Sequence, residues 1–278
     1  EGYTTHAHRS VGVEGGTLAV GGAADLVVVE MGTLIAGPFC GQILGDHGAD
    51  VLKVEPPQGD DTRAWGPPFV QAPGGEAVSA YFLSCNRGKQ SVALDFTEPA
   101  SHAWLLRQIR DADVLVENFK VGGLAKYGLD YASIAAINPR IVYCSITGFG
   151  QTGPYAKRGG YDYLAQGMGG LMSVTGFAAT GPTRSGEAIG DLCAGVYAAW
   201  AISSALFARE RHAPGAQYID VAMFDVLFSL QMTGLSNLYA NGVSASANNN
   251  AITANNNSNT QSQNAQVIAQ SESYTASS

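Results

Sequence analysis

Hydrophobic and polar positions along the chain predict strands and helices that alternate from about residue 25 to residue 150. Residues 24–30 form a short, valine-rich apolar run, which is typical of a parallel strand buried on both faces. Apolar residues then recur at helical spacing, with Pro38 suited to the first turn of a helix and Gly48 to its end. A second strand over residues 51–55 completes a βαβ unit, whose two strands should be parallel.

The same alternation continues after a loop-like stretch at residues 57–80. Strands are expected at residues 91–94, 113–117 and 141–147, and helices at residues 99–110, 123–127 and 131–137. Strands and helices in this order predict an α/β fold, a Rossmann-like doubly wound parallel sheet with helices on both faces.

The pattern beyond residue 150 is more helical. It predicts a glycine-rich, helix-like segment at residues 161–175, a long apolar helix at 192–211, a strand at 217–222 and another apolar helix at 223–238.

Three regions of different composition follow from this reading. Residues 1–24 are glycine-rich and weakly patterned, so they form an atypical N-terminal segment before one large domain over residues 25–243. Residues 244–278 are almost wholly Ala, Ser, Asn, Gln and Thr. Such a tract buries too little apolar surface to offset its ordering entropy, so we expect a disordered tail.

Composition and charge narrow the function. The chain has 15 Lys and Arg against 23 Asp and Glu, a net charge of -8, which argues against binding nucleic acid over a broad face. The 4 cysteines are widely spaced in apolar surroundings, as reduced packing residues of a cytosolic protein are. No signal peptide opens the chain and no apolar run is long enough to cross a bilayer, so we expect a cytoplasmic protein without membrane contact. His6 and His8 have no partner ligands nearby, and no metal site is expected.

Asp191 is the first candidate for chemistry, because it follows Gly190 directly at the head of a long apolar helix. From residue type and position alone, an N-cap of that helix is the more common role. A carboxylate nucleophile is the alternative, since Gly190 would let a bulky acyl group approach and backbone N–H groups at the helix start could stabilise an oxyanion. The two roles are compatible.

A second candidate site follows the strand at residues 113–117, because ligands bind at strand ends in open α/β sheets. Phe119 could stack on an adenine beside Asn118, although packing into the core is as frequent a role for such a residue. Possible phosphate partners are the basic residues Arg63, Arg87, Lys89, Lys120, Lys126 and Arg158. Neither GxGxxG nor GxSxG occurs, which counts against a dinucleotide cofactor and a serine hydrolase.

Six stretches together carry a resemblance to a known family. They read MGTLIAGPFCGQILGDHGADVLKVEPPQGDDTR, CNRGKQSVALDF, DVLVENFKVGGLAKYGLDY, NPRIVYCSITGFGQTGPYAKRGGYDYLAQGMGGLMSVTG, EAIGDLCAGVYAAWAISSALFARE and GAQYIDVAMFDVLFSLQ. Over roughly residues 27–242 the chain resembles the family III CoA-transferases, and among them most closely the dicarboxylate CoA-transferases.

The resemblance implies a reaction and a site. The Asp of the family's (I/L)GD motif falls on Asp191, which would form an aspartyl mixed anhydride and then an aspartyl-CoA thioester. Coenzyme A enters as the acyl-CoA substrate, a small carboxylic acid is the acceptor, and no metal is needed. The positions that match the family's CoA contacts are Ile35, Ala36, Leu94, Thr97, Asn118, Phe119, Lys120, Lys126, Arg158 and Tyr161. Pro56 stands where the family has a basic contact.

Two other hypotheses of function remain besides a CoA-transferase. The related α-methylacyl-CoA racemases have His where this chain has Tyr161, and a phenol of pKa about 10 is a poor substitute for an imidazole of about 6.5. Family members are usually longer, with a second, smaller domain and an interlocked homodimer. A truncated, non-catalytic CoA-binding remnant is therefore the other alternative.

Overall fold

The computed structural model describes residues 23 to 242, apart from residues 24, 72–74, 76, 178 and 213. The predicted tail at residues 244–278 and nearly all of the predicted N-terminal segment lie outside the described residues. The chain contacts divide into two compact units, Glu1–Ala165 with Ala188–Val226, and Gln166–Glu187 with Leu227–Ser278.

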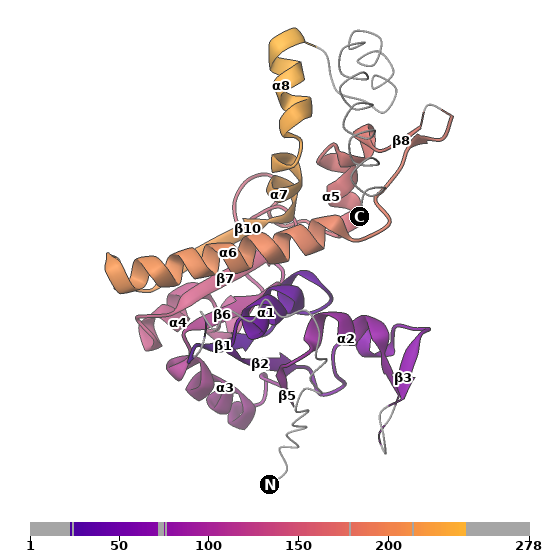
Figure 1. Ribbon diagram of the computed structural model, residues 1–278. Coiled ribbons are helices and arrows are strands. Elements are labelled where there is room, and N and C mark those ends of the chain that lie inside the picture. Colours follow the sequence, from indigo (N-terminus) through magenta and orange to yellow (C-terminus); the bar gives the residue numbers. More distant parts are fainter. Residues whose placement is uncertain are drawn as a thin grey trace, which may run out of the picture. The chain divides into compact units, whose positions relative to one another are not determined.

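The first unit is built on a sheet of six parallel strands in the order β10-β7-β6-β1-β2-β5 (Figure 1). The strands are β1 (Val27–Glu30), β2 (Asp50–Glu55), β5 (Gln90–Ala93), β6 (Val114–Glu117), β7 (Val142–Thr147) and β10 (Gln217–Ala222). Every neighbouring pair is parallel, and in the middle of the sheet Val28 lies opposite both Val51 and Val114. The predicted α/β fold with a parallel sheet is confirmed.

Helices cover both faces of this sheet (Figure 1). The helices are α1 (Ala36–Asp46), α2 (Ala80–Asn86), α3 (Pro99–Asp111), α4 (Tyr131–Ile137) and α6 (Ile189–Arg211), with a 3-10 turn, η2, at Ala125–Tyr127. On the α3 and α4 face, the side chains of Leu105, Ile109 and Ile134 are fully buried against the strands. Because side chains alternate along a strand, Val29 faces this core while Val28 faces the opposite layer, which holds α1 and α6.

The crossing of α1 and α6 depends on a small residue. A Cβ placed on Gly195 would lie 3.0 Å from the carbonyl oxygen of Ala36 and 3.1 Å from the Phe39 ring. Only glycine lets the two helices approach this closely. By length and composition α6 could also span a membrane, which corrects the expectation that no such run exists. In the structure one side of α6 packs on α1, β7 and β10, whereas Val196, Trp200 and Phe207 are exposed.

Three predicted boundaries are wrong. Residues 57–80 are not a plain loop but hold the 3-10 turn η1 (Asp61–Ala64) and an antiparallel hairpin of β3 (Phe69–Gln71) and β4 (Ala77–Ser79), which leads into α2. The helix expected at 223–238 is two helices, α7 (Met223–Ser229) and α8 (Met232–Asn241). The helix expected at 192–211 begins at Ile189, which changes the setting of Asp191.

The second unit is small. It holds the 3-10 turn η3 (Leu171–Val174), the two-stranded hairpin of β8 (Gly176–Phe177) and β9 (Gly181–Pro182), and α8. The helix α5 (Asp162–Met168) begins in the first unit and ends in the second. The first unit therefore contains Asp191 and every residue predicted to contact CoA.

Candidate active site

Asp191 lies inside the first turn of α6, two residues after Ile189. The prediction that it is the N-cap is wrong, because the helix begins earlier and Ala188 occupies the N-cap position. The acceptor at the helix start comes from α5 instead, where Asp162 Oδ1 accepts a hydrogen bond of 2.7 Å from the Gly190 N–H. Asp162 therefore satisfies one of the N–H groups that a helix leaves unpaired at its beginning.

The carboxyl group of Asp191 has unusual electrostatics. Two effects raise the pKa of Asp191 to about 7: desolvation by burial is the larger, and the negative charge of Asp162 is the smaller. This group therefore loses its proton at a much higher pH than an ordinary aspartic acid does. A carboxylate of this basicity is a stronger nucleophile than an ordinary aspartate.

Tyr81 of α2 lies within electrostatic range of the same two acids. Burial raises the pKa of Tyr81 to about 12, and the negative charges of Asp191 and Asp162 contribute to the shift. The phenol therefore keeps its proton at any physiological pH and can donate a hydrogen bond. Cys193, two residues after Asp191, also has a pKa raised by burial and by Asp162, so its thiol stays protonated.

An aromatic pocket lies beside Tyr81. The ring of Trp65 packs 5.3 Å from the ring of Tyr81, and the two help to line a pocket of about 440 Å³ with Gly66, Pro67, Pro68 and Ser84. A pocket of this size holds a small organic molecule. The sequence predicted only a loop over residues 57–80, so this pocket was missed.

The predicted CoA contacts at the ends of β1 and β6 come together. Asn118 accepts a hydrogen bond of 2.9 Å from the Thr33 N–H and donates one of 2.8 Å to the Thr33 carbonyl. This pair of bonds joins the turn after β6 to the turn that leads into α1, where Ile35 and Ala36 are buried. Asn118 therefore has a structural role in addition to any contact with a ligand.

The contacts predicted after β5 join the same cluster. Phe96, between Leu94 and Thr97, packs edge-on at 6.1 Å from Phe119. Leu94 is buried, whereas Thr97 is exposed and donates its hydroxyl and its N–H to Asp95. The ring of Phe119 is thus partly buried rather than free, as the core alternative expected.

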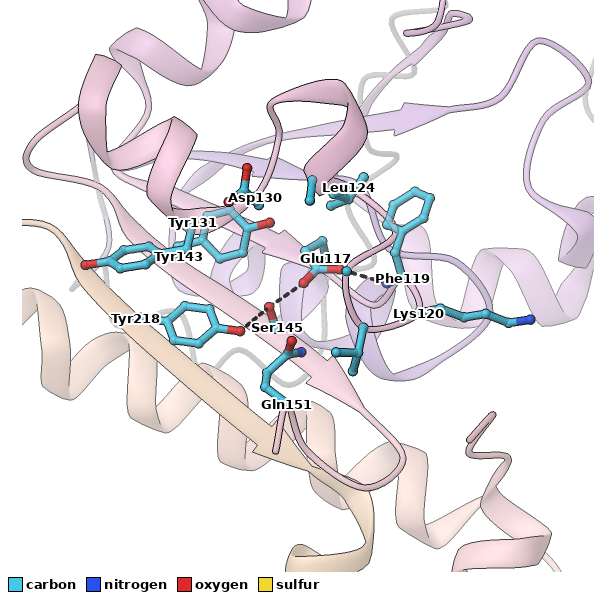
Figure 2. A pocket seen from close by; sticks show the side chains of 13 residues that line it. Glu117, Phe119, Lys120, Leu124, Asp130, Tyr131, Tyr143, Ser145, Gln151 and Tyr218 are labelled. Atoms are coloured by element: carbon cyan, nitrogen blue, oxygen red, sulfur yellow. Dashed lines mark hydrogen bonds between the residues drawn. The ribbon is translucent and has the colours of Figure 1, made fainter. Parts of the chain in front are cut away.

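Figure 2 shows a small cavity of about 50 Å³ beside this cluster. It lies beside the carboxyl end of β6, the middle of β7 and the start of β10, and is lined by Phe119 and Lys120 together with Glu117, Ser145 and Tyr218. The volume is enough for one or two water molecules, not for a nucleotide.

The six candidate phosphate partners divide into two groups. Arg63 pairs with Glu55 at 2.6 Å, Arg87 pairs with Asp46, and the buried Lys89 pairs with Glu30 at 3.0 Å. Lys89 is buried, so the prediction that it contacts a phosphate is wrong. Arg63 and Arg87 each pair with an acid but keep accessible side chains, so for them the prediction is not tested.

The other three remain exposed. Lys126 lies over the ring of Tyr127 and Arg158 over the ring of Tyr155, at 4.6 and 4.4 Å, while the Lys120 side chain extends away from the cavity (Figure 2).

Tyr161 is 71% exposed and directly precedes Asp162. Its position is fixed by a close backbone crossing, because a Cβ on Gly160 would lie 2.1 Å from the Cα of Gly148. In the part of the chain that the structure describes, no group of three or more His, Cys, Asp or Glu is arranged to hold a metal ion.

Comparison with known proteins decides the family. The profile named "CoA-transferase family III" matches residues 24–272. The chain belongs to CoA-transferase family III. It is 53% identical over 201 residues to a succinate–glutarate CoA-transferase of Agrobacterium fabrum, covering 72% of this chain and 50% of that protein. It is 44% identical over 215 residues to the succinyl-CoA:glutarate CoA-transferase of Homo sapiens, covering 77% and 47%.

A solved structure agrees with the fold of this family member. The crystal structure of a CAIB/BAIF family protein from Brucella suis superposes with a TM-score of 0.80 at 49% identity. The match covers 82% of this chain and 60% of that one. The chain thus spans about half the length of the curated relatives it matches.

Proposed function

We propose that this chain transfers CoA from an acyl-CoA donor to a carboxylic acid, with Asp191 as the nucleophile. The observation that carries the proposal is a partly buried carboxylate in the first turn of α6, whose pKa is raised to about 7 by desolvation and by the charge of Asp162. Such a group combines basicity with shelter from water, which covalent catalysis by a carboxylate needs. Membership of the family supports the reaction class.

The steps balance without any added reagent. An oxygen of Asp191 attacks the thioester carbonyl, the C–S bond breaks, and CoA thiolate leaves behind a mixed anhydride. The thiolate then attacks the Asp191 carbonyl carbon, which releases the donor acid and forms an aspartyl-CoA thioester. The acceptor carboxylate attacks this thioester to form a second anhydride, and the thiolate then attacks the acceptor's carbonyl carbon. Acyl-CoA of the acceptor leaves, and Asp191 is free again.

The surrounding residues fit these steps. Gly190 precedes the nucleophile and presents no side chain to an approaching acyl group. Tyr81 stays protonated and can donate to an oxyanion that forms beside Asp191. The exposed cations Lys120, Lys126 and Arg158 supply charge for the phosphates of CoA.

The acids are inferred from the relatives. The curated proteins named above are called succinate–glutarate and succinyl-CoA:glutarate CoA-transferases. We therefore propose short dicarboxylates as donor and acceptor, with the 440 Å³ pocket of Trp65 and Tyr81 beside the nucleophile as the place for the acid. Tyr161 in place of a histidine argues against racemisation, because a phenol is a poorer general base than an imidazole for abstracting an α-proton.

Trapping with hydroxylamine tests the nucleophile. The protein is incubated with succinyl-CoA and then hydroxylamine, and peptides are examined by mass spectrometry for a hydroxamate at Asp191. Asp191→Ala should abolish both the adduct and transfer to glutarate while CoA binding persists. Asp225→Ala is the matched control, because Asp225 is an exposed acid in the first turn of another helix, α7.

Three outcomes would contradict the proposal. CoA binding with no adduct from several acyl-CoAs would favour the non-catalytic CoA-binding alternative. Exchange of the α-proton in deuterated water without transfer would favour a racemase. Transfer that survives in Asp191→Ala would show that another group is the nucleophile.

A further inference from the structure

Glu117 is a buried carboxylate without a counter-charge. It is the last residue of β6, it is 5% exposed, and its side chain borders the small cavity of Figure 2. None of the residues that the structure describes forms a salt bridge with it. Burying a charge costs free energy unless hydrogen bonds or an opposite charge compensate for the lost hydration.

Both oxygens of this carboxylate accept hydrogen bonds from different elements. Oε2 accepts from the backbone N–H of Phe119 at 2.7 Å, and Oε1 accepts from the hydroxyl of Ser145 on β7. Tyr218 on β10 donates its hydroxyl to Ser145 Oγ at 3.1 Å (Figure 2). A chain of hydrogen bonds thus runs across three neighbouring strands and ends at the backbone of the turn after β6.

This turn is the one that carries Asn118, Phe119 and Lys120. Its start is fixed to Thr33 by the Asn118 amide, as described above, and its middle is fixed by Glu117. Glu117 makes no hydrogen bond to Lys120, whose side chain is exposed. The position of the Lys120 side chain therefore depends on the backbone of Phe119, which Glu117 holds.

We propose that Glu117 is a positioning residue that holds the Phe119–Lys120 backbone in place for the nucleotide end of CoA. The inference rests on the proposed function for the identity of the ligand. A carboxylate suits this task because it accepts at both oxygens, and hydrogen bonds to a charged acceptor are stronger than those to a neutral one. Burial raises the pKa of Glu117 above its ordinary value, Asp220 on β10 adds to the rise, and the hydrogen bonds from Ser145 and Phe119 oppose it.

The experiment compares Glu117→Gln and Glu117→Met with the wild-type chain. Methionine keeps the length of the side chain but accepts no hydrogen bond worth counting, whereas glutamine keeps one acceptor. Glu210→Gln is the matched control, because Glu210 is 63% exposed and lies on α6, away from the turn. Three quantities are measured: the Kd for CoA by calorimetry, the amide exchange rate of Phe119, and kcat against KM for CoA transfer.

Glu117→Met should raise the Kd for CoA about tenfold or more and speed Phe119 amide exchange by a similar factor. Glu117→Gln should fall between Met and wild type, and kcat at saturating acyl-CoA should stay within about twofold of wild type. If Met does not fold, Gln and Tyr218→Phe carry the test, with a rise of two- to threefold in the Kd expected from each.

An unchanged Kd and unchanged Phe119 exchange in these variants would overturn the inference while leaving the proposed function intact. A loss of kcat with an unchanged KM would also overturn it, because it would place Glu117 in the chemistry. A wild-type chain that binds no CoA would instead overturn the proposed function and with it the ligand assigned to the turn. The exchange rates would still decide whether Glu117 anchors the Phe119 backbone.

Discussion

At the scale of single residues, two carboxylates lie at the beginning of α6, and one caps the helix while the other is the proposed nucleophile. Asp162 accepts a hydrogen bond from the Gly190 N–H, and the pKa of Asp191 is raised to about 7 because Asp191 is partly buried near that charge. Environment, not residue type, separates them, as it does for paired acids in many enzymes.

The charge on Asp162 should set the pH dependence of the nucleophile. Asp162→Asn keeps an oxygen that can accept from Gly190 but removes the negative charge, so ionising Asp191 becomes easier and its pKa falls below about 7. Hydroxamate formation should therefore begin to rise at lower pH in this variant than in wild type. Rates measured between pH 4 and pH 9 check this, with Asp225→Asn as the control.

If the rise of the rate on the acid side of the pH profile is at the same pH in Asp162→Asn and wild type, the charge of Asp162 does not affect the pKa of Asp191. Titration of labelled aspartate by NMR gives the same answer without any activity.

A raised pKa also predicts a stability effect of defined sign. Asp191 binds its proton more tightly when folded, so this group's contribution to stability is complete at low pH and declines as the pH rises from about 4 to 7. Asp191→Asn removes that decline. The variant should be more stable than wild type at pH 8 by about 1 to 3 kcal/mol, and close to it at pH 4. Urea unfolding at the two pH values measures the difference, and equal differences at both would contradict it.

The sequence predicted Asp191 but not what surrounds it. The apolar pattern placed the helix start three residues late, because Ile189 and Gly190 carry no capping signal of their own. The cap is supplied by Asp162, which is 28 residues away in the chain, and no local pattern reveals such a partner. The pocket of Trp65 and Tyr81 was missed for the same reason, since it forms only when the β3–β4 hairpin and α2 fold together.

At the scale of elements, most of the sheet and its helices could be predicted. The strands β2, β5, β6, β7 and β10 each match a predicted strand to within about one residue, β1 begins three residues later than predicted, and α4 matches its predicted range. These elements have clear apolar patterns, and most of them are bounded by Gly or Pro, which is where pattern arguments work best. The hairpin of β3 and β4 has three-residue strands, which are too short for any periodicity to appear.

The approach of α1 and α6 gives a prediction at this scale. Gly195→Ala adds a methyl group at 3.0 Å from the Ala36 carbonyl, so the helices must separate slightly and the first turns of both will shift. We expect a net loss of about 1 to 3 kcal/mol, because overpacking outweighs the gain in helix propensity. Denaturant unfolding measures it.

Gly45→Ala in α1 is the matched control. Its added Cβ would meet only Val51 at 3.4 Å, which is ordinary contact. This variant should be neutral or stabilised by up to about 1 kcal/mol. Equal effects of the two substitutions would mean that the helix crossing does not depend on Gly195.

At the scale of the whole molecule, the edge of the sheet that carries the predicted CoA contacts is built on buried charge. Lys53 on β2 lies 3.5 Å from Glu30 on β1 and 3.2 Å from Asp60, and it donates to the Gly32 carbonyl at 2.9 Å. Lys89 lies 3.0 Å from Glu30 and donates to the Pro38 carbonyl at 2.6 Å. The two lysines thus form hydrogen bonds with backbone carbonyl groups on both sides of the turn that contains Ile35 and Ala36.

This network could not be read from the pattern. A lysine within a strand predicts an exposed position, and a lysine near a strand start suggests a phosphate partner. Both are buried here because Glu30 and Asp60, which come from other segments, compensate their charge.

Removing one member should therefore cost far more than breaking a surface pair. Lys53→Met leaves the carboxylates of Glu30 and Asp60 without one of their cations, and we expect a loss of about 3 to 5 kcal/mol in the free energy of unfolding. Arg87→Ala breaks the exposed pair with Asp46 and should cost less than about 1 kcal/mol. Urea denaturation compares the two.

The two variants should also differ in CoA binding. Lys53→Met removes the hydrogen bond to the Gly32 carbonyl and loosens the turn into α1, so its Kd for CoA should rise even well below the unfolding midpoint, whereas that of Arg87→Ala should not. Equal stability losses in the two variants would show that the buried network does not dominate the stability of this part of the sheet. A Kd for CoA that does not change in Lys53→Met would show that the network does not position the turn into α1.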